Sequence, residues 1–299
     1  MLTFFQFQFR MVDNSLKVVG AGQLGLRVAL LWKRKFPESN IFLKTRSHDE
    51  ARTHSWSKAG FKPLSKETES RDSPVKAKNV LFCAPLTNNP SYVDDVRESL
   101  YSWSKEDGGV FVFTSSSGVY EEKDGGIVDE KSPVKQNSDR YKILLQCEDV
   151  VKAAGGIVMR LAGLYTKRFG PHSYWLKNSS GIIESPSCPN GLINLIHYDD
   201  AASVIVDALT IVPGEPNKVF LVSDGVPTSR QDICQAAMKC PEYSKSIFPK
   251  FTGNPTKVEG KRCNTTRVRE AFGWRPKFQS FADFMTSGYN EEMDLEGLL

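Results

Sequence analysis

The feature that most constrains this chain is a glycine-rich turn between a short β-prone segment, Leu16 to Val19, and a helical pattern. Apolar residues recur after the turn at the spacing of one helix face, and the glycines follow the spacing G-x-G-x-x-G. In such a turn the first glycine permits the sharp bend, the second lets a pyrophosphate approach the backbone, and the third lets the helix pack on the strand. The helix N-terminus adds N–H groups and a positive dipole. The pattern therefore predicts a dinucleotide site that includes Gly20, Gly22, Gln23, Leu24 and Gly25.

The second predicted strand, residues 40–45, indicates which dinucleotide binds. An NAD site usually carries an acidic residue near the end of this strand for the ribose hydroxyls, whereas this chain carries Thr45 and Arg46. A guanidinium there can pair with a 2′-phosphate in a bidentate, charge-assisted contact. A solvated arginine at a strand end is the alternative. We therefore expect NADP(H), with NAD less favoured, and assign Thr45 and Arg46 to the cofactor site.

Composition predicts one enzyme-sized unit, because 299 residues with 40% hydrophobic and 25% charged residues suffice for a large core. The net charge of +4 is dispersed along the chain, and without a recognition motif we expect no nucleic-acid partner. No segment approaches the roughly 18 apolar residues of a membrane span, so no membrane partner is expected. The six cysteines lack paired metal-ligand spacing, which predicts no metal and a reducing, cytoplasmic setting. Residues 1–10 lack the features of a signal peptide and are expected to be an extension.

Strand and helix patterns alternate along the chain, which predicts an α/β fold with a doubly wound parallel Rossmann sheet. The further strands are expected at residues 79–83, 110–113, 157–161, 192–196 and 219–222. The further helices are expected at residues 92–104, 140–152 and 199–209, and from a capping box of Thr228 and Gln231 to residue 240. The strand ends add four residues to the cofactor site, namely Cys83, Ala84, Pro85 and Thr114. We expect a Rossmann domain over residues 12–165 and mainly a smaller C-terminal substrate-pocket region over 166–299, with residues 192–223 returning to the sheet.

Several short motifs give this chain a family resemblance. They are Thr114 to Tyr120 with Asp129, Glu130 and Pro133, then Arg160 to Tyr165, Asn194 to Asp200, Val222 to Pro227, and finally Thr265 to Val268 with Phe272 to Pro276. In this order they resemble the extended short-chain dehydrogenase/reductase family, which includes sugar-nucleotide epimerases and dehydratases. The similarity covers residues 17 to about 285. It implies a Rossmann domain that binds NAD(P) and a smaller C-terminal region that shapes a substrate pocket.

The resemblance also implies two catalytic residues, Ser116 and Tyr141. In the family a serine at a strand end holds the reacting oxygen, and the tyrosine of a Tyr-x-x-x-Lys motif transfers the proton. A polar turn without catalytic function is the alternative for Ser116. A phenol, with its ordinary pKa near 10, needs a nearby cation for this task, but the family's lysine position is Leu145 here. Lys142 cannot easily replace it, because on a helix it points roughly 100° away from Tyr141.

A second register of the same motif is open. If the alignment is anchored on Glu148, the family's tyrosine falls on Arg140 and its lysine on Leu144. The lysine is then missing in both registers, and in the second the tyrosine is missing as well. This departure places the chain nearer the atypical branch of the family, whose members keep the cofactor fold without the full Tyr/Lys pair.

The loops near the predicted cofactor site supply the candidates for substrate binding, namely Tyr120, Arg160, Tyr165, Arg168 and His172. The two arginines could bind an anionic group, whereas His197 is expected to be structural. We expect an NADP(H)-dependent oxidoreductase or epimerase-like protein that acts on a carbinol or carbonyl carbon of a small polar substrate. A non-catalytic NADP(H)-binding regulatory or scaffold protein is the alternative. We leave open whether the chain forms a homodimer.

Overall fold

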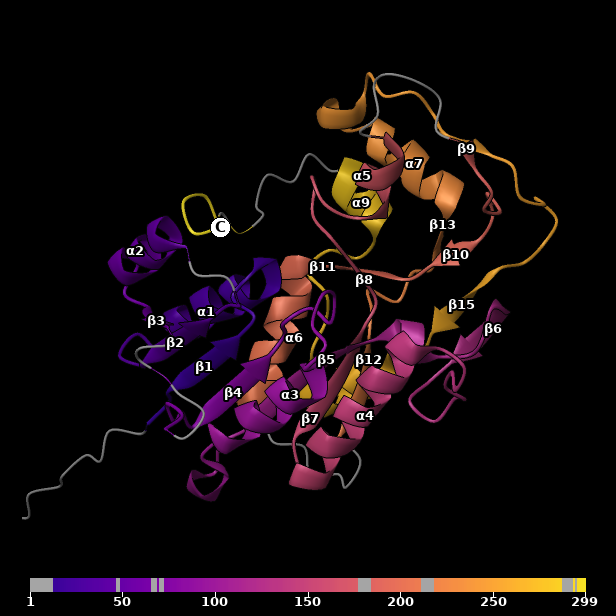
Figure 1. Cartoon of the computed structure of the whole chain (residues 1–299). Helices are drawn as coiled ribbons and strands as arrows, with labels where there is room; N and C mark the ends of the chain where they lie inside the picture. Colours follow the sequence, from indigo (N-terminus) through magenta and orange to yellow (C-terminus); the bar gives the residue numbers. More distant parts are fainter. Residues whose placement is uncertain are drawn as a thin grey trace, which may run out of the picture.

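The computed structural model describes residues 13–299 except 47–48, 66–68, 70–72, 177–183, 211–217, 287–292 and 294. Residues 1–10, predicted to be an extension, therefore lie outside the described part of the chain. Figure 1 shows a parallel sheet with helices on both faces and a separate cluster formed by α5, α7 and α9. No described helix combines the length and the apolar composition that a membrane-spanning segment needs.

The large sheet has seven parallel strands in the order β12-β7-β5-β4-β1-β2-β3. The strands are β1 (Leu16–Val19), β2 (Ile41–Lys44), β3 (Lys62–Leu64), β4 (Asn79–Phe82), β5 (Phe111–Ser116), β7 (Ile157–Leu161) and β12 (Val219–Val222). This order confirms the predicted doubly wound Rossmann fold. The chain runs from β1 to β3 on one side and from β4 to β12 on the other, so the switch point lies between β1 and β4, where such sheets bind ligands beyond their carboxyl ends.

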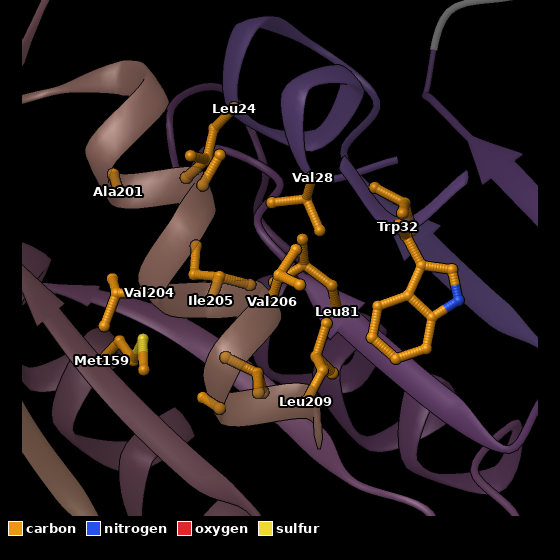
Figure 2. Packing of buried hydrophobic residues seen from close by; sticks show 14 of the residues in the cluster. Leu24, Val28, Trp32, Leu81, Met159, Ala201, Val204, Ile205, Val206 and Leu209 are labelled. Carbon is orange, nitrogen blue, oxygen red and sulfur yellow. The ribbon is translucent and has the colours of Figure 1, made fainter. Parts of the chain in front are cut away.

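One face of the sheet is covered by four helices, α1 (Gln23–Lys35), α2 (Glu50–Lys58), α6 (Tyr198–Thr210) and α8 (Thr266–Phe272). Figure 2 shows how α1 and α6 pack together over the strands, with the labelled side chains Leu24, Val28, Trp32, Leu81, Met159, Ala201, Val204, Ile205, Val206 and Leu209. Each large aliphatic side chain buried in this way contributes roughly 1.5–3 kcal/mol relative to an exposed one. This packing holds the N-terminus of α1 at the carboxyl edge of the sheet.

The opposite face is covered by α3 (Tyr92–Tyr101) and α4 (Asp139–Ala154). Phe82 of β4 and Phe113 of β5 pack against Tyr92 there, with ring centroids 5.5 and 6.4 Å from the Tyr92 ring. The helix α4 ends at Gly155, which has the left-handed φ of 87° that terminates helices. The helix contacts β5 and the short 3₁₀ turn Ser117–Val119 that follows this strand.

The C-terminal region contains α5 (Pro171–Leu176), α7 (Arg230–Met238) and α9 (Phe281–Thr286) around its own apolar core. Four two-stranded sheets surround it, made of β6 (Asp124–Val128) with β15 (Gly260–Cys263), β8 (Gly163–Tyr165) with β11 (Leu195–His197), β9 (Glu184–Ser185) with β14 (Lys250–Phe251), and β10 (Leu192–Ile193) with β13 (Thr228–Ser229). The chain reaches this region beyond the carboxyl ends of the large sheet (Figure 1), on the side where the predicted cofactor residues lie.

Three local predictions differ from the structure. The strand expected at residues 192–196 is two strands, because the amide side chain of Asn194 turns away to bond the Lys261 carbonyl and the Cys263 N–H at 2.8 and 2.9 Å. The stretch 163–175, for which no strand or helix was predicted, includes β8 and most of α5. The capping box at α7 lies one residue later than predicted, since Ser229 accepts the Asp232 N–H and donates to its carboxylate at 2.6 Å.

Candidate dinucleotide site

The glycine turn has the geometry that a phosphate needs. Gly20 has a φ of +105°, and a Cβ on it would lie 2.3 Å from the Ala84 nitrogen, so only glycine fits there. A Cβ on Gly25 would lie 2.4 Å from the Gly20 carbonyl oxygen, which shows that this glycine lets α1 approach the strand. A Cβ on Gly22, in contrast, would meet nothing within 4 Å. The open space at Gly22 and the uncapped first turn of α1 leave backbone N–H groups accessible to an anion.

A cavity of about 1580 Å³ follows the carboxyl edge of the sheet past this turn. It crosses the ends of β2, β1, β4 and β5, which span about 14 Å at the usual strand spacing. Ten of the eleven residues predicted to bind the cofactor line it, namely Gly20, Gly22, Gln23, Leu24, Thr45, Arg46, Cys83, Ala84, Pro85 and Thr114. The eleventh, Gly25, is buried under the turn. One elongated cavity thus brings together residues that are widely separated in the sequence.

Three cations lie at the β2 end of this cavity, Lys44, Arg46 and Arg52. Arg46 donates to the carbonyls of Asn88 and Thr87 at 2.7 and 3.0 Å, which ties the end of β2 to the loop after β4. The Nε of Arg52 is buried and makes no hydrogen bond within the described part of the chain. Sequence reasoning missed Arg52, because it lies in the first turn of α2, where a basic residue opposes the helix dipole and no motif marks it.

A buried charge cluster closes the wall beside these cations. Lys17, on β1, is 2% exposed, contacts the Glu69 carboxylate and donates to the Ser102 hydroxyl at 2.7 Å. Lys44 lies 2.8 Å from the second Glu69 oxygen. Burial lowers the pKa of Lys17, and burial alone would raise that of Glu69, but the two lysines bring the Glu69 pKa below its usual value. The Glu69 carboxylate therefore offsets the charge of the buried Lys17. Lys44, the second lysine beside Glu69, remains partly exposed and lines the cavity.

Ser116 lines the opposite end of the cavity, at the end of β5. Its Oγ accepts the Gly118 N–H at 3.0 Å, so its own O–H is available to a ligand. A Cβ built on Gly118 would lie 3.1 Å from this Oγ and 2.7 Å from the Tyr141 hydroxyl oxygen. The two predicted catalytic hydroxyls therefore approach the same point, although Tyr141 itself is not among the residues that line the cavity.

Two lysines from other elements surround the turn that carries Gly118. The Nζ of Lys135 lies 4.6 Å from the centre of the Tyr141 ring and donates to the Gly118 carbonyl at 3.0 Å. Lys261 donates to the Tyr120 carbonyl at 2.9 Å. Burial, with a smaller contribution from the Lys135 charge, lowers the pKa of Lys261 to about 8. Although position 145 is leucine, an ammonium group is therefore present beside Tyr141.

The face of α4 that meets the cavity carries Arg140 and Leu144, both of which line it. Glu148 continues the same i, i+4 stripe and accepts the Ser115 hydroxyl at 2.6 Å from below. Arg140 and Leu144 are the two residues that the second of the alignments considered above selects, and this is the face that α4 turns to the cavity. Tyr141 lies on the neighbouring face of the helix, beside Gly118.

Two predicted substrate residues, Arg160 and Tyr120, lie in the interior instead of on the cavity. Arg160 donates to Glu148 through Nη2 at 2.7 Å and through Nε at 3.1 Å, and both side chains are almost fully buried. Its guanidinium carbon lies 5.0 Å from the centre of the Tyr120 ring, which is 0% exposed. Burial raises the pKa of Tyr120 to about 12, which the Arg160 charge opposes. Both residues are therefore buried in the interior, where Arg160 shares the Glu148 carboxylate with Ser115 and packs on Tyr120, and neither lines the cavity.

The remaining substrate candidates also lie away from the cavity. Tyr165 and His172 are 0% exposed, and both pack on Phe281, with ring centroids 5.0 and 5.1 Å from it. The Nε2 of His172 lies 3.1 Å from the Lys167 carbonyl. Arg168 is exposed and does not line the cavity. The structure uses Tyr165 and His172 to build the core of the C-terminal region, a placement that residue type alone cannot reveal.

Neither a protein-family model nor a curated protein matches the sequence. Solved structures do match, and the first is a conserved protein of unknown function from Silicibacter pomeroyi (22% identity, 91% of this chain, 97% of that chain, TM-score 0.67). A UDP-glucose 4-epimerase from Bifidobacterium longum in complex with NAD⁺ and UDP also matches, with 15% identity over 91% of this chain and 96% of that chain and a TM-score of 0.68. A UDP-glucuronic acid 4-epimerase from Bacillus cereus in complex with NAD matches with 15% identity over 91% of this chain and 96% of that chain and a TM-score of 0.69. This chain therefore shares the Rossmann-like α/β fold of these proteins, as its strand and helix pattern predicted.

Proposed function

We propose that this chain binds NADP(H) along the carboxyl edge of its sheet and uses it for hydride transfer at an oxygen-bearing carbon of a small polar substrate. The observation that carries the proposal is that one cavity contains, in order, a cationic end, the open glycine turn and Ser116. The two epimerase structures of the same fold were solved in complex with NAD⁺ or NAD, which supports a nicotinamide dinucleotide as the ligand.

The residues present fit the phosphate part of such a ligand. The backbone at Gly22 is open where a pyrophosphate would approach, and the first turn of α1 carries no acidic side chain that would repel it. Gln23 and Leu24, the first helical residues, line the cavity and would present their N–H groups to a phosphate. This part of the site does not distinguish NADP from NAD.

The cationic end favours a 2′-phosphate over a free ribose hydroxyl. The two residues directly after β2 are Thr45 and Arg46, where an NAD site usually carries an acidic residue for the ribose, and both line the cavity. The nearest acidic residue along the chain, Asp49, caps α2 by accepting the Arg52 N–H. The buried Nε of Arg52 lacks a partner in the described structure, and a phosphate oxygen would satisfy it. We therefore assign Arg46 and Arg52 to the 2′-phosphate.

A bound nicotinamide ring supplies or accepts the hydride. Ser116 would donate its free O–H to the reacting oxygen and hold it in place, because its Oγ is fixed by the Gly118 N–H. Tyr141 is the candidate proton donor, since its hydroxyl and the Ser116 Oγ both lie close to the same point beside Gly118. The Lys135 ammonium over its ring would stabilise negative charge on the phenol oxygen.

Fluorescence titration with NADPH and NADH tests the cofactor assignment. Loss of one charge-assisted phosphate contact costs about 1.5–3 kcal/mol, or about 10- to 150-fold in affinity. Arg52→Ala should weaken NADPH binding by this factor and leave NADH binding nearly unchanged. Arg97→Ala is the matched control, because Arg97 lines the same cavity and is paired with Asp94 at 3.1 Å, whereas Arg52 lies 3.9 Å from Asp49 and its Nε has no partner in the described structure. Equal losses for both dinucleotides in Arg52→Ala would remove the 2′-phosphate assignment.

A non-catalytic NADP(H)-binding protein is the second candidate function. It is supported by the cavity face of α4, which carries Arg140 and Leu144, because the second register would align these two residues with the tyrosine and lysine of the Tyr-x-x-x-Lys motif. The two functions separate in an assay of NADPH oxidation with a panel of small aldehydes and ketones. Turnover that is lost in Tyr141→Phe supports the enzyme, whereas tight NADPH binding without turnover for the whole panel supports the binding protein.

A further inference from the structure

We propose that Arg140 binds an anionic oxygen group of the substrate, a carboxylate or a phosphate, beside Ser116. This inference rests on the proposed function, since it names the substrate class for the same site. Arg140 takes the role of anion-binding residue that the sequence analysis gave to Arg160 and Arg168. Arg160 is paired with Glu148 in the interior, and Arg168 lies away from the cavity. The substrate would then be a small anion that carries its charge near the reacting carbon.

Arg140 is an exposed side chain that lines the cavity and forms no hydrogen bond or ion pair with the residues that the structure describes. Two carboxylates of α3 that line the same cavity already have partners. Asp94 is paired with Arg97 at 3.1 Å, and Asp95 accepts the Asn89 amide at 2.8 Å. The N–H donors of the Arg140 guanidinium are therefore available to a ligand in the cavity. The planar arrangement of these donors matches the oxygens of a carboxylate or a phosphate.

The position of Arg140 favours substrate over cofactor. It lies at the start of α4, which packs on β5 and on the turn after Ser116, two strands and about 10 Å from the glycine turn on β1. Its charge acts on Tyr92, opposing the rise in the pKa of that phenol that burial causes. Tyr92 in turn donates to the Ala84 carbonyl at 2.9 Å, in the loop after β4. Arg140 thus stands between the ends of β4 and β5, at the Ser116 end of the cavity.

Helix stability does not account for an arginine at this position. Arg140 is the second residue of α4, where a cation opposes the helix dipole by about 0.3–1 kcal/mol. A guanidinium also stays protonated at any usual pH, so it cannot replace the family's tyrosine as an acid or base. It can bind and orient a charge, and Ser116 is within the same end of the cavity to hold the neighbouring oxygen.

The test is calorimetric titration of the NADP⁺-saturated protein with malonate, with inorganic phosphate and with neutral malonamide. Arg140→Gln should weaken the binding of the preferred anion by about 10- to 150-fold, and Arg140→Lys should fall between it and the wild type. Malonamide should bind far more weakly than malonate. Arg97→Gln, which changes a paired guanidinium in the same cavity, should leave the anion affinity unchanged. The preferred anion distinguishes a carboxylate substrate from a phosphorylated one.

Four results would overturn the inference. They are equal anion affinity in the wild type and Arg140→Gln, equal binding of malonate and malonamide, no binding of either anion at millimolar concentration, and a more than tenfold loss of NADPH affinity in Arg140→Gln. The last result would assign Arg140 to a cofactor phosphate. If NADPH fails to bind the wild type, the proposed function fails, and the same titrations of the protein without NADP⁺ still decide the role of Arg140.

Discussion

Removal of the Glu148 carboxylate tests whether Arg160 is a structural residue. The two side chains are 1% and 7% exposed, and three N–H···O contacts of 2.7 to 3.2 Å join them. Glu148→Leu leaves the guanidinium buried without a counter-charge, which costs about 3–5 kcal/mol. With an unfolding entropy of about 2.1 cal/mol/K per residue, 299 residues convert this loss into a Tm lower by about 5–8 °C. Thermal unfolding followed by circular dichroism measures the shift.

A double-mutant cycle with Arg160→Met separates the interaction energy of the Arg160–Glu148 pair from the energy lost through changed packing. Arg160→Met/Glu148→Leu should be more stable than Glu148→Leu alone, because no unpaired buried charge remains. Asp149→Leu is the matched control on the same helix, since Asp149 is exposed and its pair with Lys152 contributes less than about 1 kcal/mol. The reasoning is refuted if Glu148→Leu costs no more than Asp149→Leu, or if the two changes in the cycle are additive.

Three further predictions concern the site and its surroundings. Gly22→Val should keep the thermal stability, because its Cβ enters open space, but lower NADPH affinity at least about 100-fold in fluorescence titration; unchanged affinity contradicts the phosphate turn. Lys135→Gln should slow any NADPH oxidation without changing NADPH affinity, whereas Lys142→Gln, an exposed control on α4, should not; equal rates contradict a role for Lys135. Burial raises the pKa of Asp224 to about 7, so the folded chain keeps a proton that the unfolded chain releases above about pH 4. Stability should therefore fall by up to about 1.4 kcal/mol per pH unit from pH 4 to 7 in urea unfolding, and Asp224→Asn should remove this slope; an unchanged slope contradicts the assignment.

The glycine turn and the parallel sheet could be predicted from the sequence because local patterns determine them. A tight turn at Gly20 and a close helix approach at Gly25 depend on residues only a few positions apart. The buried strands read as short apolar runs that end in polar residues, as β5 does at Ser116. Since the carboxyl ends of parallel strands lie at one edge of the sheet, the residues that follow each strand could be predicted to line one site.

The register of α4 could not be decided in this way. The two alignments of α4 differ by one residue, so the residues that they assign to the cavity lie on helix faces roughly 100° apart. The sequence of the helix is compatible with both. The packing of Glu148 on Ser115 and Arg160 determines which face meets the cavity, and these partners lie on β5 and β7. The same contacts bury Arg160, so an arginine that looked available to a substrate is paired.

The most direct test of the central claim is a crystal structure of the protein with NADP⁺. Our proposal predicts a pyrophosphate on the backbone at Gly22, a 2′-phosphate within hydrogen-bonding distance of Arg46 or Arg52, and the nicotinamide ring beside Ser116. A dinucleotide bound outside this cavity, or bound with its nicotinamide at the cationic end, would contradict the proposal.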